Sequence, residues 1–408
     1  MGKLKIAYVL PGIDVSGGVA VVLQHTSRLL RRGHDVMIGS MGSISRAGWL
    51  SNRSVPILRT ADLPDDLDIL VATSWATVFE IVKLKARHKC YFVQSDETRF
   101  HNQGTDWFHF AHLSYLMNMH FLTEAKWIQE WLLRNFGKQS ALIPNGLDQE
   151  IFHPATPLEK KTDRPRVLLE GAIALAYKGM KEAFEALKDL DIEIWCVSSY
   201  GKPEPGWRCD RFFEKVPIDR MNEIYSSCDI LLKLSRVEGF FGPPLEMMAC
   251  GGVCVVGAVT GHEEYIADGE NALVVDPTDI KGARGAVQRL IADRNLREKL
   301  RKNGLRTAAQ WPWEPSIDRL ETYFSEIAAG VYGETNPCRE QTNQSIAYFY
   351  EKILSLPSSQ SIDSLEVLAH RIKRHVSNEF LLKLGEKTYY HMLKHKSLYN
   401  RLSKLITK

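Results

Sequence analysis

The sequence predicts an α/β fold class with two doubly wound domains, and three observations support it. Short apolar runs alternate with stretches of helical periodicity, which is typical of parallel sheets covered by helices. The alternation stops at a polar, proline-bearing stretch over residues 154–165 and then begins again. With 408 residues, the chain is long enough for two core-forming domains and an appended segment.

The first domain is expected to cover residues 1–153. It begins with an apolar strand, a glycine-rich turn over residues 11–18 and an amphipathic helix over residues 19–32. Gly33 is expected to end that helix, since glycine is common just past helix ends. The expected strands of this domain lie at residues 5–10, 34–38, 68–73 and 89–94.

The second domain is expected to cover residues 154–312, with its linker at 154–165. Two prolines within residues 311–315 interrupt the chain again before a helix at about 316–329. Residues 337–408 carry 12 Lys and Arg against 6 Asp and Glu, which predicts a basic helical extension. The expected strands of the second domain lie at residues 166–170, 192–197, 229–234 and 253–256.

The composition is that of an ordinary soluble enzyme, with 44% hydrophobic and 25% charged residues. A net charge of +3 is too small to indicate a nucleic-acid partner. The longest apolar runs fall short of the roughly 20 residues that span a bilayer, and no signal peptide is expected before the first strand. Seven cysteines without a CxxC pair favour reduced thiols, so a cytoplasmic protein is expected.

The most informative segment runs from Glu238 to Glu246, two carboxylates eight positions apart across a glycine- and proline-containing loop. Pro243 and Pro244 suit the first turn of a helix, so the loop is expected to present free backbone N–H groups at a helix start. Such a start binds anions, and we expect Glu246 within that first turn. Phosphates need donors and sugar hydroxyls need ionised acceptors, which together indicate a sugar-nucleotide pocket.

This segment resembles the Glu-x7-Glu pattern of the retaining family 4 glycosyltransferases, which have the GT-B fold. The likeness continues through residues 261–277 and is also found earlier, at residues 143–148 and 152–154. It covers roughly residues 4–328. It implies two Rossmann-like domains facing across a cleft, with the acceptor on the first, the nucleotide sugar on the second, and a helix at 313–332 that crosses back to the first.

The resemblance also implies roles for individual residues. Glu238 would bind the donor sugar, Glu246 the ribose, and Lys178 the diphosphate as a point charge. Gly17 and Gly18 follow the first strand, where glycine lets the backbone approach a ligand, although a tight turn alone would also explain them. The other residues expected along the donor are Gly239, Phe240, Phe241, Gly242, Leu245 and, near the base, Val216.

One departure from the family pattern concerns the diphosphate. The family usually has an arginine five residues before the lysine, but Ile173 occupies that position and residues 171–177 contain no arginine. A departing diphosphate in a site without metal needs cationic neutralisation. Arg236 is the candidate substitute, with a solvated loop charge as the alternative.

On the acceptor side, the end of the strand at 89–94 leads into Ser95, Asp96 and Glu97. The family places a catalytic acidic residue or histidine there, and this tract most resembles the bacterial rhamnosyltransferase branch. We expect Asp96 to be catalytic together with Glu238 and Lys178, with Glu97 and His101 as further acceptor-side candidates. His109, His112 and His120 fall in an aromatic helical run and are expected to be structural.

Two patterns in the sequence are also compatible with other chemistries. A glycosidase pair of carboxylates is disfavoured, because one carboxylate adjoins the expected phosphate site and nothing in the sequence indicates a raised pKa. Asp66-Leu-Asp68 and Asp189-Leu-Asp191 match a DxD metal pattern, but both precede apolar strands, where acidic turn residues are common. No metal and no cofactor besides the donor substrate is therefore expected.

The sequence therefore predicts a retaining, metal-independent glycosyltransferase of bacterial surface polysaccharide assembly, with a glycan or lipid-linked glycan acceptor. Rhamnose from dTDP-rhamnose is the first choice of donor. A sugar-nucleotide epimerase, a phosphorylase, or an inactive donor-binding assembly subunit are the alternatives. Within the extension, Leu398, Leu402 and Leu405 share one helical face beside a basic one, which would contact the inner membrane surface or a partner protein.

Overall fold

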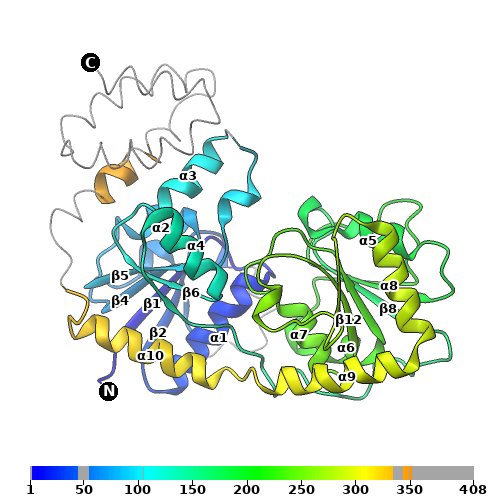
Figure 1. The fold of residues 1–408 in the computed structure, drawn as a ribbon. Coiled ribbons are helices and arrows are strands. Elements are labelled where there is room, and N and C mark those ends of the chain that lie inside the picture. Colours follow the sequence, from blue (N-terminus) through cyan, green and yellow to red (C-terminus); the bar gives the residue numbers. More distant parts are fainter. Residues whose placement is uncertain (1, 45–54, 104, 334–342, 349, 352–408) are drawn as a thin grey trace.

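The computed structural model describes residues 2–44, 55–103, 105–333, 343–348 and 350–351. Two α/β lobes lie side by side, each with a sheet between layers of helices (Figure 1). Every paired strand within the two sheets runs parallel to its neighbour. The predicted fold class of two doubly wound domains is confirmed.

The first sheet has seven strands in the order β3-β2-β1-β4-β5-β6-β7. Its strands are β1 (Lys5–Leu10), β2 (Asp35–Ser40), β3 (Ile57–Arg59), β4 (Ile69–Ala72), β5 (His88–Val93), β6 (His120–Thr123) and β7 (Ser140–Leu142). Helices α1 (Gly17–Arg31) and α10 (Glu314–Ala328) pack on one face of this sheet. Helices α2 (Trp75–Ile81), α3 (Asp106–Ser114) and α4 (Lys126–Phe136) pack on the other.

The second sheet has six strands in the order β10-β9-β8-β11-β12-β13. Its strands are β8 (Arg166–Glu170), β9 (Glu193–Ser198), β10 (Arg211–Glu214), β11 (Ile230–Lys233), β12 (Val253–Gly257) and β13 (Leu273–Val275). Helices α5 (Met180–Leu187), α8 (Ile280–Ala292) and the start of α9 (Arg294–Ala309) contribute to one core. Helices α6 (Ile218–Ser227) and α7 (Gly242–Ala249) contribute to the core on the opposite face.

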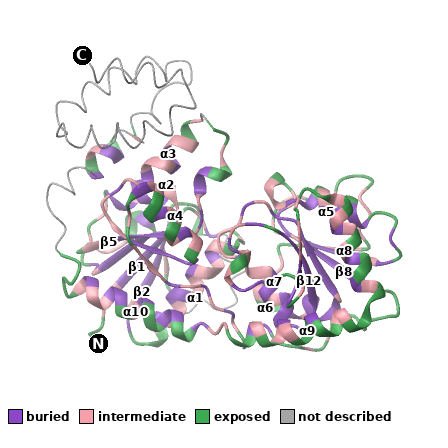
Figure 2. Cartoon of the chain, in the orientation of Figure 1, coloured by how far each residue is buried: buried purple, intermediate pink, exposed green. Residues whose placement is uncertain are grey.

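The strands are buried on both sides, as Figure 2 shows by their purple colour. This explains why they read as continuous apolar runs in the sequence rather than as alternating ones. One expectation was wrong: His120 does not continue a helical run but begins β6, whereas His109 and His112 do lie in α3. The histidine-rich stretch therefore divides between a helix and a strand.

Two segments connect the lobes, and they lie against each other. The backbone N–H of Leu147 donates to the carbonyl of Trp311 at 2.6 Å, and Leu147 forms a bridge with Pro312. Gly146 has no room for a side chain, because a Cβ atom there would lie 2.6 Å from the Cα of Trp313. Leu147 and Phe152 already pack into the second core, so the first crossing precedes the linker expected at 154–165.

After the second crossing, α10 returns to the first lobe (Figure 1). Its residues Ile317, Leu320 and Phe324 are fully buried in the same core as β1. Asn343 lies beside the segment between α3 and β6, where its side chain hydrogen-bonds both backbone groups of Asn118, at 2.8 and 2.9 Å. The expected basic helix near the end of the chain lies outside the described residues.

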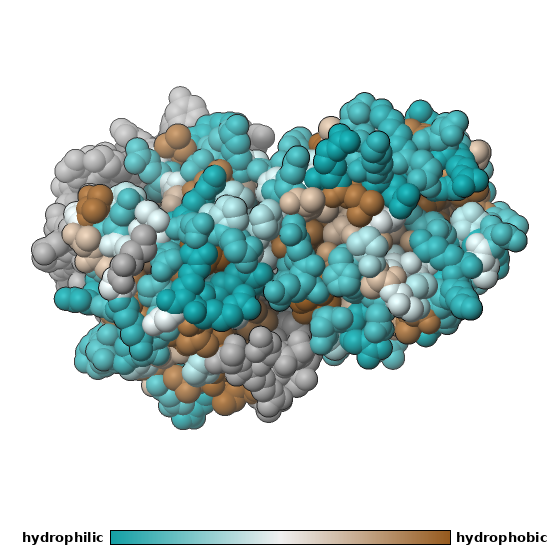
Figure 3. Space-filling view, turned by 90° about the horizontal axis from the view of Figure 1, so that it is seen from below, coloured by the Kyte–Doolittle hydropathy of each residue, from teal (hydrophilic) through white to brown (hydrophobic). Residues whose placement is uncertain are grey.

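None of the helices in the described part of the chain is both long enough and apolar enough to span a membrane. Hydrophilic residues cover most of both lobes in the view from below, and hydrophobic ones form separate smaller areas (Figure 3).

Candidate functional site

The start of α7 carries the segment that the sequence singled out. The helix begins at Gly242 with prolines at its first positions, as expected. It has no acidic residue in its first turn, so the expectation that Glu246 lies there was wrong. Glu246 begins the second turn and folds back, with its Oε1 3.7 Å from the position a Cβ atom on Gly242 would take. Its carboxylate therefore still lies beside the helix start.

Glu238 and Lys178 meet at this end of the second sheet. The Lys178 ammonium donates to both carboxylate oxygens of Glu238, at 2.8 and 2.9 Å. Lys178 ends a short 3-10 helix, η4 (Ala176–Lys178), and the following Gly179 has a φ of +65°. A Cβ atom on Gly179 would overlap the carbonyl of Leu234, so glycine permits the close approach that brings the lysine to the carboxylate.

A second lysine, Lys233, lies beneath this pair at the end of β11. Its Nζ is 2.6 Å from Glu170 Oε2 and 3.9 Å from Glu238 Oε1. Burial opposes the ionisation of Glu238, but the charges of Lys178 and Lys233 outweigh it and lower the pKa of Glu238. Glu238 is therefore a buried carboxylate that is held ionised by two cations.

Glu246 is in the opposite electrostatic situation. Burial raises the pKa of Glu246 to about 7, and the charge of Glu170 adds to this rise. The hydroxyl of Tyr225 donates to Glu246 Oε2 at 2.8 Å and limits the shift. The expectation that neither carboxylate has a raised pKa is therefore wrong for Glu246, and the pKa of Glu246 does not argue against a glycosidase pair.

The loop between Glu238 and Gly242 is in direct contact with the first domain. The indole N–H of Trp127 donates to the carbonyl of Gly239 at 2.8 Å, and the N–H of Phe240 donates to Glu124 Oε1 at 2.9 Å. A Cβ atom on Gly239 would overlap the backbone oxygen of Gln94. The two domains thus close directly on the loop that leads into α7.

Further contacts join the domains on either side of this loop. Glu264 of the second domain accepts hydrogen bonds from the N–H groups of Lys126 and Trp127, the first residues of α4, at 2.7 and 3.2 Å. Arg99 donates to the hydroxyl of Thr260 at 2.8 Å. Each domain therefore places a carboxylate on backbone amides of the other.

The glycines of the first loop differ in their surroundings. Gly17 begins α1 and faces open space, whereas a Cβ atom on Gly18 would lie 3.1 Å from Oε1 of Gln94. That oxygen is buried and has no hydrogen-bond partner. Since the backbone of Gln94 also touches Gly239, Gln94 connects Gly18 to the loop before α7.

The acceptor-side candidates are held by the first domain itself. Asp96 caps the 3-10 helix η3 (Glu97–Phe100) by accepting from the N–H of Thr98 at 3.1 Å. Glu97 is buried and accepts from the N–H of Trp75 at 3.1 Å, and burial raises its pKa to about 7. His101 packs edge-on against Trp75, with ring centroids 5.8 Å apart. Of these three, only Asp96 and His101 remain partly accessible.

The side chain of Arg236 is held by neighbours in the second domain. Its guanidinium donates to Glu182 of α5 at 2.9 Å and to the carbonyl of Ala176.

Four of the remaining donor-side candidates pack in or against the core of the second domain. Phe241 and Leu245 are buried in its core, while Phe240 and Val216 pack against that core.

The acidic pairs that match a metal pattern are engaged elsewhere. Asp66 pairs with Lys5 at 2.6 Å, and Asp191 pairs with Arg164 at 3.1 Å. Among the residues that the structure describes, no group of three His, Cys, Asp or Glu side chains is arranged to hold a metal ion. These turns have structural partners at the ends of strands.

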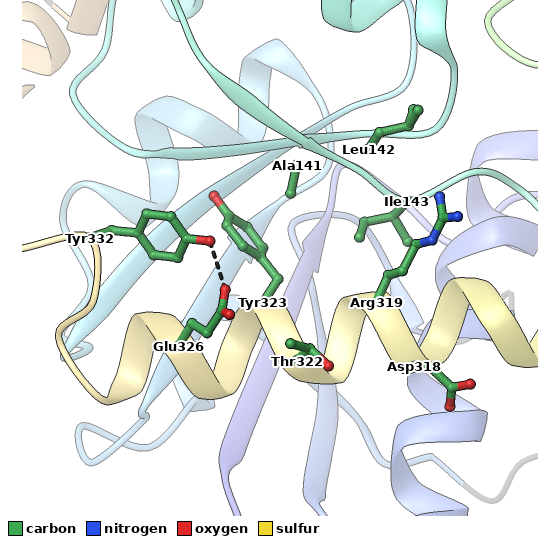
Figure 4. A pocket seen from close by; sticks show the side chains of 9 residues that line it. All are labelled: Ala141, Leu142, Ile143, Asp318, Arg319, Thr322, Tyr323, Glu326 and Tyr332. Carbon is green, nitrogen blue, oxygen red and sulfur yellow. Dashed lines mark hydrogen bonds between the residues drawn. The ribbon is translucent and has the colours of Figure 1, made fainter.

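A surface pocket of about 360 Å³ lies between β7 and α10. Figure 4 shows its lining, including Tyr332, whose hydroxyl donates to Glu326 at 2.7 Å. None of the residues discussed at the domain contact lines it. This pocket is therefore separate from the candidate site.

Several residues at the site were missed by sequence reasoning. Lys233 could have been found, because a lysine inside the apolar run Ile-Leu-Leu-Lys-Leu has no place in a plain core strand. Glu170 is the last residue of β8, and Glu124 and Asn145 follow β6 and β7, so all three look like ordinary residues at strand ends or in loops. Only the fold shows that they converge at the domain contact.

Known proteins resemble the chain in two ways. The family model described as glycosyl transferases group 1 matches residues 211–307, which include both Glu238 and Glu246. The O-antigen biosynthesis protein RfbC of Myxococcus xanthus is 24% identical over 291 residues, 68% of this chain and 22% of that protein. The chain spans 22%, 58% and 48% of the lengths of the first three curated relatives.

Two solved structures share the fold over most of the described chain. Sucrose-phosphate synthase from Thermosynechococcus elongatus has a TM-score of 0.66 at 18% identity, over 80% of this chain and all of that one (100%). HepE from Anabaena, in complex with UDP-glucose, has a TM-score of 0.66 at 13% identity, over 79% of this chain and 100% of that one. These likenesses show the GT-B arrangement of two Rossmann-like domains.

Proposed function

We propose that this chain is a retaining glycosyltransferase, which moves a sugar from a nucleoside diphosphate to an acceptor hydroxyl. The observation that carries the proposal is the ion pair of Glu238 with Lys178 at the start of α7, within 2.9 Å. It puts a cation, an ionised acceptor and a helix amino end in one place. The group 1 family match covers Glu238, Glu246 and α7.

In this proposal the second domain binds the donor. Lys178 and the amino end of α7 receive the diphosphate, Glu238 accepts hydrogen bonds from sugar hydroxyls, and Glu246 accepts them from the ribose. The sugar leaves the diphosphate and joins the acceptor oxygen on the same face, while the departing phosphate takes the acceptor proton. The protein's part is to stabilise the leaving group and to position both partners.

The acceptor binds on the first domain, near Asp96 and His101. The name of the Myxococcus relative places that protein in O-antigen biosynthesis, which supports a glycan or lipid-linked glycan as acceptor here. Such an acceptor would be met at the inner face of the cytoplasmic membrane. Rhamnose from dTDP-rhamnose is our first choice of donor, and the UDP-glucose bound by HepE makes UDP-glucose the second.

A panel of nucleoside diphosphates and their sugars tests the proposal. We expect one nucleotide sugar to raise the melting temperature most, because a ligand that binds only the folded state stabilises it. The same compound should release its nucleoside diphosphate on incubation, and EDTA should not slow that release. Absence of both stabilisation and turnover with every donor would refute the proposal.

Substitutions at the two carboxylates test the assigned roles. Glu238→Gln and Glu246→Gln keep the side-chain volume and should each reduce turnover at least ~100-fold, a loss of about 2.7 kcal/mol in transition-state stabilisation. Glu223→Gln, on an exposed pair with Arg220, is the matched control and should retain activity. Near-normal turnover of either site variant would contradict its role.

A second candidate is supported by one observation. Ile173 stands where the family has an arginine, so the site carries less positive charge than a diphosphate leaving group needs. The chain would then bind the donor in an assembly without transferring its sugar. Stabilisation by a nucleotide sugar without any release of nucleoside diphosphate, over a range of acceptors, would favour this function.

A further inference from the structure

Lys233 is a charged residue in the interior of the second domain, and its position gives it a task in the proposed donor site. We propose that Lys233 is the fixed counter-ion of Glu238, which keeps this carboxylate ionised and in place while Lys178 turns to the donor's diphosphate. The inference rests on the proposed function, because it concerns the charge balance of the same site. Lys233 is a positioning residue, since it acts through Glu238.

The geometry distinguishes the two lysines. The Lys233 side chain is 2% exposed, and its Nζ donates to the carboxylate of Glu170 at 2.6 Å and to the Glu170 carbonyl at 2.9 Å. The Lys178 side chain is 21% exposed and donates to Glu238 alone. Lys233 is therefore fixed in the interior, whereas Lys178 can turn toward a ligand.

Stability alone does not explain a charge at this position. The other residues of β11, Ile230, Leu231 and Leu232, are buried and apolar. Replacing a buried ion pair by apolar residues of similar volume is often neutral or even stabilising. A lysine retained in such a strand indicates a requirement that an apolar core would not meet.

The missing arginine identifies that requirement. Residues 171–177 contain no arginine, and the guanidinium of Arg236 is engaged by Glu182 at 2.9 Å. A bound diphosphate competes with Glu238 for Lys178. A buried carboxylate that loses its cation takes up a proton, and a protonated Glu238 would be a poorer acceptor for sugar hydroxyls. Lys233, 3.9 Å from Glu238, prevents this.

Other titratable groups also face Glu238. They lie in the first domain, in η4 and in the loop after β12. Besides Lys178 and Lys233, these groups are Glu124, Tyr177 and Tyr265. The tyrosines are neutral at ordinary pH, and among these titratable groups the two lysines favour the ionised form of Glu238.

The test replaces the buried pair by neutral side chains, in the variant Lys233→Met/Glu170→Gln. We expect wild-type stability at pH 7, because both charges are removed together. The titration of Glu238 should nevertheless move to higher pH by about one unit, since one of its two cations is gone. Glu246 is influenced by both members of the pair in opposite directions, so its own titration changes little.

Two measurements follow Glu238 separately. The first compares each protein with its own Glu238→Gln derivative in the absence of ligand. It records how the difference between their melting temperatures changes with pH. The second is the acid limb of donor binding, with dTDP-rhamnose and UDP-glucose as probes. Lys161→Met is the matched control, because Lys161 pairs with Asp229 at 3.1 Å in the same domain and should shift neither curve.

A double variant that matches the wild type in stability and in both pH curves would show Lys233 to be merely structural and would overturn the inference. Should that variant not fold, Glu170→Gln alone decides. This variant removes the ionised partner of Lys233, so that Glu238 is the remaining carboxylate beside this lysine. The titration of Glu238 without ligand should then move to lower pH. An unchanged titration overturns the inference.

The proposed function can fail separately. If neither probe binds the wild type and no donor is turned over, the proposed function is wrong. The ligand-free titration of Glu238 still shows whether Lys233 controls this carboxylate. A shifted titration of Glu238 without any donor binding would show that Lys233 keeps Glu238 ionised, but it would reject the role of Lys233 in donor binding.

Discussion

Glu124 of the first domain accepts a hydrogen bond from the backbone N–H of Phe240 in the second, at 2.9 Å. Its other carboxylate oxygen accepts from the side chain of Asn145, also at 2.9 Å. Burial, with a smaller contribution from the charge of Glu238, raises the pKa of Glu124 to about 8. A carboxylic acid that is mostly protonated at neutral pH therefore joins the domains at the loop before α7.

This pKa predicts how Glu124 affects stability. The folded protein holds a proton on Glu124 up to about pH 8, whereas the unfolded chain loses it near its ordinary value, about 4.5. The contribution of Glu124 to the free energy of unfolding is thus fully present below the pKa of the unfolded chain and is lost as the pH rises through 8. Glu124→Gln, which cannot ionise, should melt higher than the wild type at pH 9 and about equally at pH 5. Calorimetry at both pH values checks this.

The alanine variant separates charge from hydrogen bonding. Glu124→Ala leaves the N–H of Phe240 and the amide of Asn145 without a partner, which costs about 1–3 kcal/mol for a buried group. It should therefore be less stable than Glu124→Gln at every pH. Equal melting curves for the two variants would show that Phe240 and Asn145 find water or other partners.

Gly239 tests the contact between the domains. In Gly239→Ala the new methyl group overlaps the backbone oxygen of Gln94, so the domains cannot close fully. Turnover should fall at least ~10-fold, a barrier increase of about 1.4 kcal/mol, and small-angle scattering should show a larger radius of gyration. Gly285→Ala in α8 is the control, since nothing lies within 4 Å of its new Cβ atom. An unchanged radius in Gly239→Ala would contradict the prediction.

Glu264 tests the other side of the same contact. Its carboxylate caps the amino end of α4 across the domain boundary, at 2.7 Å from the N–H of Lys126. Glu264→Ala should lower the free energy of unfolding by about 0.5–2 kcal/mol, as the loss of a helix cap does. Glu263→Ala, next to it and exposed, should cost less than half of that. Denaturant titration of both variants measures the difference.

Tyr225 controls the titration of Glu246. Its hydroxyl donates to that carboxylate at 2.8 Å and keeps the pKa of Glu246 from rising above about 7. In Tyr225→Phe the pKa of Glu246 should rise further. As the solution is acidified, donor binding should therefore begin to weaken at a higher pH than in the wild type. The exposed Tyr200 provides the control Tyr200→Phe, for which the pH profile of donor binding should stay unchanged.

His25 predicts loss of stability in acid. It is fully buried among aromatic rings, and burial, together with the charge of Arg28, lowers its pKa to about 3. Below pH 6.5 the unfolded chain binds a proton here that the folded protein refuses until about pH 3, so stability is lost as the pH falls through this window. His25→Phe should flatten that part of the stability profile, which calorimetry of both proteins between pH 3 and 7 checks.

The fold could be predicted largely from the sequence, because a parallel sheet buried on both faces leaves continuous apolar runs such as residues 166–170 and 253–256. Short edge strands such as β3 and β7, with three residues each, leave no such run. At the site, Glu238 and Lys178 were found through a motif, and they do meet. Partners that come from distant parts of the chain, such as Glu124 for Phe240, have no local pattern.

Arg236 shows the limit of reasoning from nearness in the chain. It lies two positions from Glu238, yet its side chain extends back to α5, where Glu182 offers an ionised partner. Lys233 is further away in the chain but shares the buried side of Glu238. The directions of strand and loop, which a linear sequence does not contain, decide where each cation lies.

The return of α10 to the first lobe has a consequence for biosynthesis. Ile317, Leu320 and Phe324 complete the interior of a sheet whose strands end at Leu142. While the chain emerges from the ribosome, the second lobe has all of its own strands before the first has its last helix. The amino-terminal lobe must therefore wait, with part of one apolar face uncovered, until α10 has been made.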